Sequence, residues 1–176
     1  MSYRAPRWLR GGHAQTIWPA LAVKVAPPAY RRELWDTPDG GHIALDFVDG
    51  KPGAPLVVLF HGLEGSSASH YAKALMQALA ARGWHGVVSH FRGCGGVDNP
   101  LPRAYHAGDA AEVRWILQRL SARFAAIAAV GVSLGGSMLL NYLAEEGEAA
   151  LPCAAAAVSA PLDLVAASTR LDRGLG

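Results

Sequence analysis

The sequence predicts an α/β fold, in which helices cover both faces of a mostly parallel β-sheet. Short apolar runs of strand length alternate along the chain with longer segments whose apolar residues recur at helical spacing. The chain has 176 residues, 51% hydrophobic and 17% charged, which suits one domain with a substantial core. Its formal net charge of +2 comes without any basic run, so we expect no nucleic-acid partner.

Residues 1–30 are predicted to be an amino-terminal lead-in segment packed on the domain, and residues 31–176 to form the domain itself. The lead-in lacks the continuous apolar core and the small-residue cleavage site of a signal peptide, which is consistent with a cytoplasmic protein. Contact of its tryptophans with lipid stays open, but packing on the domain is the simpler interpretation. The apolar side chains concerned are Trp8, Leu9, Ile17 and Trp18.

Three strands and a helix are predicted next. RRELWDT (residues 31–37) and HIALDFVDG (residues 42–50) flank the turn sequence PDGG and are expected to pair as antiparallel strands. LVVLF (residues 56–60) is continuously apolar, as in a buried parallel strand. SHYAKALMQALAARG follows with a helical pattern, Ser69 being a candidate N-cap and Gly83 the end of the helix.

The rest of the chain repeats this alternation of strands and helices. The run 124–144 carries no charged residue and is long enough to span a bilayer. Glycines interrupt it in the middle, so a strand, a tight turn and a buried helix explain it better. The candidate elements, in order, are a strand in WHGVVSHF, a helix in GDAAEVRWILQRLSA, a strand in FAAIAAVGV, a helix in LGGSMLLNYLAEEG and a final strand in CAAAAVSA, after which no further helix or strand is expected.

A serine between glycines lies at the predicted junction of strand and helix in this run. Gly131-Val-Ser133-Leu-Gly135 has the G-x-S-x-G pattern, in which a sharp turn lifts a serine hydroxyl to where a base can reach it. Such a turn needs neighbours without bulk, a requirement that Gly131 and Gly135 meet. The five residues alone are also compatible with a serine that only packs in a glycine-rich bend. Their place after a strand and before a helix favours a catalytic nucleophile at Ser133.

A second loop, HGLEG (residues 61–65), follows the strand LVVLF. Because the carboxyl ends of parallel strands meet at one edge of a sheet, this loop is expected beside the serine turn. Acyl transfer needs two backbone N–H groups aimed at the developing oxyanion. We expect one from Leu134, directly after the nucleophile, and the other from Leu63. His61 and Gly62 are predicted to support the loop, and His61 is not expected to be the base.

Several motifs together extend this interpretation to a family. They are WLRGGHAQTIWPAL, LVVLFHGLEGSS, HFRGCGG, YHAGD, GVSLGGSMLLNYL and SAPLDL. In these motifs, in their order and over nearly its whole length, the chain resembles the YheT-like α/β-hydrolases (AB hydrolase family 4). The resemblance implies an α/β-hydrolase fold with Ser133 as the nucleophile of carboxylic-ester hydrolysis, acting on short-chain ester or acylglycerol-like substrates. It implies no metal and no organic cofactor.

Other reactive side chains have simpler explanations. The two cysteines, Cys94 and Cys153, are expected to be reduced thiols, with Cys94 a small loop residue. Arg92 could bind polar substrate groups, but a loop anchor that bonds to carbonyls is the favoured interpretation. Asp109 is expected to cap a helix. Asp163 stands where some related hydrolases carry the acid; since the resemblance places the acid after the next strand, Asp163 is expected to structure its loop.

No histidine follows Ser133, although the chain order of an α/β-hydrolase is serine, then acid, then histidine. We therefore expect the amino-terminal portion of a longer hydrolase, without its last strands, that is inactive or impaired as an isolated chain. Its final apolar strand would be an open edge prone to self-association. Two alternatives stay open: a noncatalytic or partner-completed α/β-hydrolase fragment, and a haloperoxidase-like or transferase reaction on the same fold.

Overall fold

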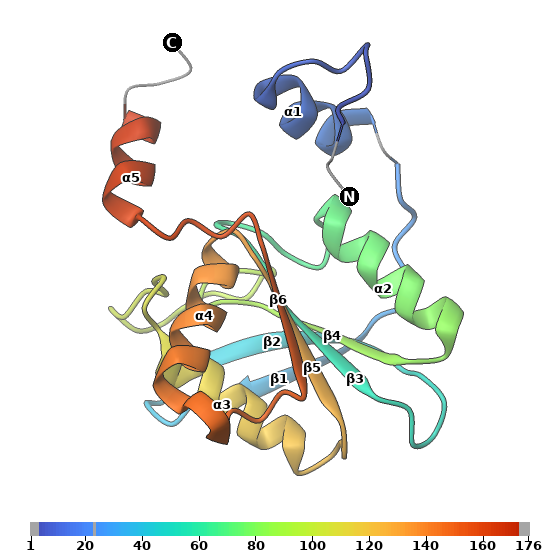
Figure 1. The fold of residues 1–176 in the computed structure, drawn as a ribbon. Helices are drawn as coiled ribbons and strands as arrows, with labels where there is room; N and C mark the ends of the chain where they lie inside the picture. Colours follow the sequence, from blue (N-terminus) through green and yellow to red (C-terminus); the bar gives the residue numbers. More distant parts are fainter. Residues whose placement is uncertain (1–3, 23, 173–176) are drawn as a thin grey trace.

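The computed structural model describes residues 4–22 and 24–172, which form a six-stranded mixed sheet flanked by helices (Figure 1). The strands lie in the order β1-β2-β4-β3-β5-β6. The strands are β1 (Arg31–Asp36), β2 (His42–Val48), β3 (Leu56–Phe60), β4 (His85–Ser89), β5 (Ile127–Val132) and β6 (Ala154–Val158). The helices are α1 (Gly12–Ala22), α2 (His70–Arg82), α3 (Ala110–Ser121), α4 (Leu134–Glu146), the short 3-10 helix η1 (Gly147–Ala149) and α5 (Leu164–Asp172).

The sheet is antiparallel at one edge and parallel through its centre. β1 pairs with β2 and β2 with β4 in antiparallel register, whereas β4, β3, β5 and β6 run parallel. The turn between β1 and β2 is closed by Thr37 N–H, which donates to Gly41 O at 2.8 Å. The strands and helices that the sequence predicts between residues 31 and 160 are all confirmed, and so is the mostly parallel sheet.

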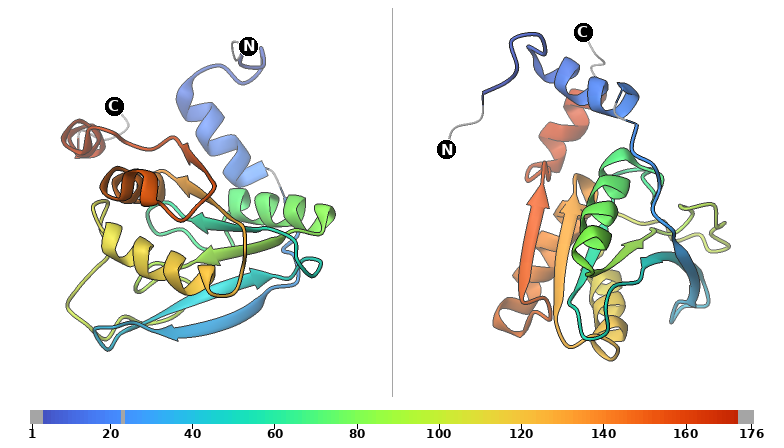
Figure 2. Two further views of the ribbon diagram at one scale, coloured as in Figure 1. Left: turned by 60° about the horizontal axis from the view of Figure 1, so that its bottom comes forward. Right: turned by 90° about the vertical axis from the view of Figure 1, so that its right-hand side faces the viewer.

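β3 is buried along its whole length because helices cover both of its faces. Val58 and Phe60 belong to the apolar cluster that includes α3 and α4, while Val57 and Leu59 belong to the cluster that includes α2. Successive residues of a strand point to opposite faces, which explains the division. Figure 2 shows the corresponding layers, with α2 on one side of the sheet and α3 and α4 on the other.

α2 begins after Ser69 and ends at Gly83, as the sequence predicts. Gly83 has a φ of 69°, the left-handed conformation that glycine adopts without steric cost. The Ser69 side chain makes no capping hydrogen bond, which differs from the expectation. Its Oγ accepts instead from Ser66 N–H at 3.1 Å, so the hydroxyl organises the loop that precedes the helix.

The uncharged run 124–144 folds into a strand, a turn and a helix, as predicted. β5 ends at Val132, Ser133 makes the turn, and α4 begins at Leu134. In the part of the chain that the structure describes, no helix combines the length and the hydrophobicity needed to cross a bilayer.

Two helices differ from the sequence prediction. α1 lies within the lead-in segment, and α5 follows β6, so the expectation of no further helix after the last strand is wrong. Asp163 explains α5, because its Oδ1 accepts from Ala166 N–H at 2.9 Å and thereby caps the helix. Both helices lie beyond the end of the sheet at which the parallel strands finish (Figures 1 and 2).

The lead-in segment leaves its apolar side chains exposed. Trp8 and Trp18 are 68% and 49% exposed, and their rings contact each other edge to face, 5.4 Å apart. α1 lies beyond the end of the sheet, and the packing of these side chains on the domain stays a prediction. The end of the segment does reach the domain, where Gln77 Nε2 donates to Ala26 O at 2.6 Å. The division of the chain at residue 30 stays a prediction.

Candidate active site

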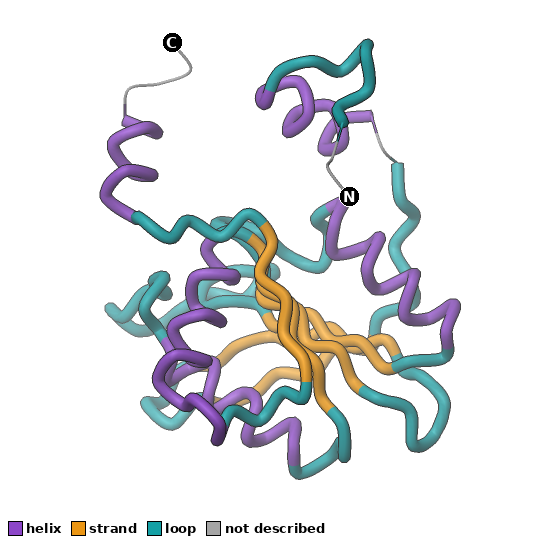
Figure 3. Tube along the Cα trace, in the orientation of Figure 1, coloured by secondary structure: helices purple, strands orange, loops and turns teal. Residues whose placement is uncertain are grey.

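The loops that follow the four parallel strands collect at one end of the sheet (Figure 3). Ligands bind at this end in open α/β sheets. The residues that the sequence singles out lie in two of these loops: His61, Gly62 and Leu63 follow β3, while Ser133 and Leu134 follow β5. Because β3 and β5 are hydrogen-bonded neighbours, the two loops emerge side by side.

Ser133 occupies a strained turn. Its φ of 52° and ψ of −119° lie outside the regions that residues other than glycine normally adopt. The surrounding backbone fixes the turn: Ser133 N–H donates to Val158 O at 2.9 Å, and Ser133 O accepts from Ser137 N–H at 3.1 Å. The half-buried Ser133 side chain makes no hydrogen bond to any described residue. Its hydroxyl is therefore available at the end of the sheet.

Glycine is required around Ser133 because there is no room for a side chain, and not because the backbone adopts an unusual φ. A Cβ on Gly131 would lie 2.5 Å from Gly135 O, and one on Gly136 would lie 2.8 Å from the Cβ of Ala160. A Cβ on Gly135 would overlap the carbonyl oxygens of Phe60 and His61. The start of α4 is thus pressed against the end of β3.

This close approach puts the loop after β3 beside the serine. A Cβ on Gly62 would lie 3.3 Å from the Cβ of Ser133. Leu63 comes next, with a side chain that is 61% exposed and an N–H without an acceptor among the described residues. Leu134 is the first residue of α4, so its N–H has no acceptor within the helix. The two segments in which the sequence predicts a backbone donor therefore both adjoin Ser133, and among the described residues neither amide has an acceptor.

His61 is fully buried and uses both ring nitrogens within the fold. Its Nε2 accepts from Phe91 N–H at 3.1 Å, which leaves Nδ1 to donate to Gly62 O at 2.7 Å. Burial lowers the pKa of His61 to about 4, so the ring is neutral at neutral pH. Neither nitrogen is free to take a proton from Ser133. The bond to Gly62 O holds the loop directly beside the serine.

His90 and His85 are engaged in the same manner. His90 is buried; its Nε2 accepts from Ser67 N–H at 3.0 Å, its Nδ1 lies 3.1 Å from Ala44 O, and burial lowers its pKa. His85 Nδ1 accepts from Gly50 N–H at 2.9 Å. In residues 4–22 and 24–172, no histidine is hydrogen-bonded to Ser133.

Arg92 anchors its loop, but through carboxylates and not through the carbonyls that we expected. Its Nε donates to Glu112 Oε2 at 2.5 Å and its guanidinium also donates to Asp39 Oδ1 at 3.1 Å. Arg92 and Glu112 are both buried, and burial raises the pKa of Glu112 although Arg92 opposes the shift. Sequence reasoning missed Glu112. The spacing Asp109-x-x-Glu112 was the available signal, since Asp109 caps α3 by accepting from Glu112 N–H at 3.3 Å.

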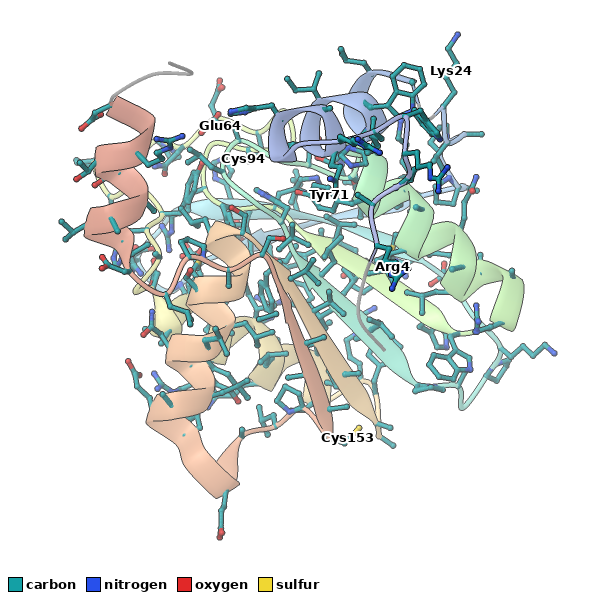
Figure 4. All side chains as sticks on the ribbon, turned by 45° about the horizontal axis from the view of Figure 1, so that its top comes forward. Arg4, Lys24, Glu64, Tyr71, Cys94 and Cys153 are labelled. Atoms are coloured by element: carbon teal, nitrogen blue, oxygen red, sulfur yellow. The ribbon has the colours of Figure 1, made fainter. Side chains whose placement is uncertain are left out.

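The cysteines show no arrangement for nucleophilic chemistry. Cys94 is buried and Cys153 exposed, and neither forms a disulfide. Burial raises the pKa of Cys94, which disfavours the thiolate. Figure 4 shows the two at opposite ends of the sheet, with Cys94 near Glu64. Among the residues that the structure describes, no group of His, Cys, Asp and Glu side chains is arranged to hold a metal ion.

Comparison with known proteins gives a consistent result. Residues 55–174 match a family model described as the alpha/beta hydrolase fold. The chain is 45% identical to YheT of Escherichia coli K12, a predicted esterase, over 92% of this chain and 49% of that relative. It is 30% identical to the human phospholipase ABHD3 over 99% of this chain and 45% of that relative. The chain therefore spans about half the length of the curated relatives that it matches.

Solved structures show the same fold. The Pyrococcus furiosus esterase Pf2001 superimposes with a TM-score of 0.66 at 22% identity, covering 84% of this chain and 58% of that one. Mouse alpha/beta hydrolase domain-containing protein 10 superimposes with a TM-score of 0.65 at 18% identity, covering 80% and 54%. At these identities the likeness concerns the fold alone.

Proposed function

The chain belongs to the α/β-hydrolase family, and from this premise we propose that it carries the nucleophile half of a serine hydrolase of carboxylic esters. The observation that carries the proposal is the strained turn at Ser133, which lies next to Gly62 in the loop after β3. Among the described residues, the Ser133 hydroxyl has no hydrogen-bond partner and the amides of Leu63 and Leu134 have no acceptor. A left-handed backbone at a residue other than glycine is costly and is concentrated at functional sites. The names of the relatives, an esterase and a phospholipase, support an ester substrate, and within that class we propose short-chain ester or acylglycerol-like substrates.

The chemistry assigned to these groups is acyl transfer in two steps. Ser133 Oγ attacks the ester carbonyl and gives its proton to a base, and the resulting oxyanion accepts hydrogen bonds from the amides of Leu63 and Leu134. Collapse of this intermediate expels the alcohol, which takes up the proton, and leaves an acyl-enzyme. Water then attacks the acyl group and gives a proton to the base; the carboxylic acid is released and Ser133 Oγ takes the proton back.

The base is the part of this scheme that the chain does not supply. All seven histidines precede Ser133 in the sequence, and the buried ones are committed to hydrogen bonds within the fold. We therefore propose that the isolated chain is inactive or strongly impaired. Transition-state stabilisation by the two amides would leave only a residual rate.

A second candidate is a fragment completed by another polypeptide, and the edge of the sheet favours it. Every residue of β6 is exposed, and this strand also holds the turn through the bond from Ser133 N–H to Val158 O. A strand added along β6 would place its own following loop beside Ser133. In this second candidate, the added polypeptide provides the acid and the histidine.

Labelling with a fluorophosphonate probe tests both candidates. The isolated chain is expected to label at a small fraction of the rate of a complete hydrolase. The Ser133→Ala variant is expected to show no labelling at this position. Co-expression with a histidine-bearing carboxyl-terminal polypeptide should restore labelling at Ser133 if the chain is partner-completed. Rapid labelling of Ser133 in the isolated chain would show that one of the seven histidines serves as base and would refute the proposed impairment.

A further inference from the structure

The loop between β3 and α2 satisfies its amides with one exception. Of the eight consecutive N–H groups from Gly62 to Ser69, only that of Leu63 has no acceptor among the described residues. The other seven donate to Tyr71 Oη (from Gly62), Tyr105 Oη (Glu64), Gly62 O (Gly65), Ser69 Oγ (Ser66), His90 Nε2 (Ser67), Ser66 Oγ (Ala68) and Ser66 O (Ser69). A frayed loop would leave several amides free, so the single exception is selective.

Two tyrosine hydroxyls from outside the loop occupy the amides on either side of Leu63. Tyr71, on α2, accepts from Gly62 N–H at 3.0 Å. Tyr105, in the segment before α3, accepts from Glu64 N–H at 3.1 Å. Figure 4 shows Tyr71 and Glu64 at the same end of the sheet.

Tyr105 holds residue 64 at two points. Its hydroxyl accepts from the Glu64 amide and donates to Glu64 Oε1 at 2.6 Å. Glu64 needs such support, because its φ of 52° is strained for a residue other than glycine. Burial, and then the bond to Glu64, raise the pKa of Tyr105, so the hydroxyl keeps the proton that it donates.

Tyr105 is itself fixed to the loop after β4. Its ring stacks on Phe91 with 5.0 Å between centroids and 24° between planes. The N–H of Phe91 donates to His61 Nε2, and the His61 ring in turn donates to Gly62 O. The loop around Leu63 is therefore held on both sides. Before Leu63, His61 bonds to Gly62 O; after it, Tyr105 bonds to Glu64; and Phe91 contacts both His61 and Tyr105.

We propose that Tyr71 and Tyr105 are positioning residues for the oxyanion donor, because they engage the amides of Gly62 and Glu64 and leave the Leu63 amide alone for the substrate oxygen. The inference rests on the proposed function, since Leu63 is assigned as a donor there. Tyr71 fixes the residue before the donor and Tyr105 the residue after it. Neither hydroxyl is assigned a contact with the substrate.

Phenylboronic acid provides a test that does not require a histidine base. Its boron accepts the Ser133 Oγ electron pair, the hydroxyl proton passes to the buffer, and the boron becomes tetrahedral and anionic. One boronate oxygen then mimics the oxyanion. In ¹H–¹⁵N spectra of the unsubstituted chain, we expect the amide protons of Leu63 and Leu134 to move downfield on binding, and Ser133→Ala to abolish the effect.

The positioning role predicts a specific response to loss of each hydroxyl. Removing one oxyanion donor costs about 10²–10³-fold in catalysis, so partial misorientation in Tyr105→Phe should weaken boronate binding about tenfold and reduce the Leu63 shift. Tyr71→Phe should act in the same direction. Tyr142→Phe is the matched control, because Tyr142 Oη also accepts a backbone amide, that of Leu151 at 3.0 Å, but away from the loop. It should leave binding unchanged.

The outcomes separate this inference from the proposed function. If the unsubstituted chain forms no boronate adduct at Ser133, both the proposed function and the positioning role are refuted. A second result is that the adduct forms and shifts the Leu63 amide resonance while Tyr105→Phe and Tyr71→Phe bind the boronate as tightly as Tyr142→Phe does. That result overturns the positioning role alone. Hydrogen exchange at the Glu64 amide shows independently that the folded variant has lost the contact, since this amide should exchange faster in Tyr105→Phe than in Tyr142→Phe.

Discussion

The centre of the sheet and its β6 edge differ in how completely they are covered. β3 is buried from end to end between two layers of helices, and in the loop after it only the Leu63 amide lacks an acceptor among the described residues. β6 is exposed at every residue, although it pairs in regular register with β5. The side of the site that carries the proposed nucleophile and the proposed oxyanion donors is therefore covered by helices, whereas the side next to β6, where we propose that an acid and a base are added, is exposed.

The largest loss of stability is expected when a charged side chain is introduced into the buried centre of the sheet. Ala129, on β5, is 1% exposed and pairs with Ala155 on β6. Ala129→Lys would bury an ammonium group without a partner, so we expect a loss of more than about 4 kcal/mol in the free energy of unfolding. Urea denaturation followed by circular dichroism measures it. A folded variant of near-normal stability would show that water or an acidic side chain reaches position 129.

Gly135→Ala should have the next largest effect. The added Cβ would overlap the carbonyl oxygens of Phe60 and His61, which forces α4 away from β3 and costs about 3 kcal/mol. Gly12→Ala is the matched control, because a Cβ there meets nothing within 4 Å, and it should stay within about 0.5 kcal/mol of the unsubstituted chain. Equal stability of the two variants in urea would contradict the close approach of helix and strand.

The buried His61 predicts an intermediate, pH-dependent effect. Burial lowers its pKa in the folded state to about 4, from 6.5. The unfolded chain therefore binds the proton more readily, and folding stability falls as pH falls through 6.5 toward 4. Protonation of His61 in the unfolded chain should therefore lower the free energy of unfolding by about 2 kcal/mol between pH 7 and pH 5.

His61→Gln should flatten the dependence of the free energy of unfolding on pH over that interval. His13→Gln, on the exposed face of α1, is the control and should keep the slope of the unsubstituted chain. An unchanged slope in His61→Gln would mean that His61 is not held neutral by burial.

The smallest change in stability is expected at the open edge. Ala155→Lys places the same charge on the β6 partner of Ala129, but on an exposed strand, so it should change stability by less than about 0.5 kcal/mol. Because charged side chains oppose edge-to-edge pairing, it should also reduce self-association of the chain. Sedimentation velocity over a range of concentrations measures this. Identical sedimentation of the variant and the unsubstituted chain would remove β6 as the associating edge.

Sequence reasoning was most successful where a local pattern carried the information. The continuous apolar run of β3 and the glycines around Ser133 predicted a buried strand and a tight turn, and both are present. α1 was missed because Pro19 interrupts its short apolar pattern, and α5 was missed because it has only nine residues and closely follows Pro161. The carboxylate partners of Arg92 were missed because they come from two separate segments.

The sequence by itself determined the order of strands and helices between residues 31 and 160, the place of Ser133 between a strand and a helix, and the absence of any histidine after it. These features depend on side-chain periodicity and on the steric needs of one turn, both of which are local. The tertiary structure alone decided that Tyr71 and Tyr105 flank Leu63 and that both nitrogens of His61 are occupied. Residue 105 reaches residue 64 only because β3 and β4 are neighbours in a parallel sheet, and the pattern of residues along the chain does not specify such a contact.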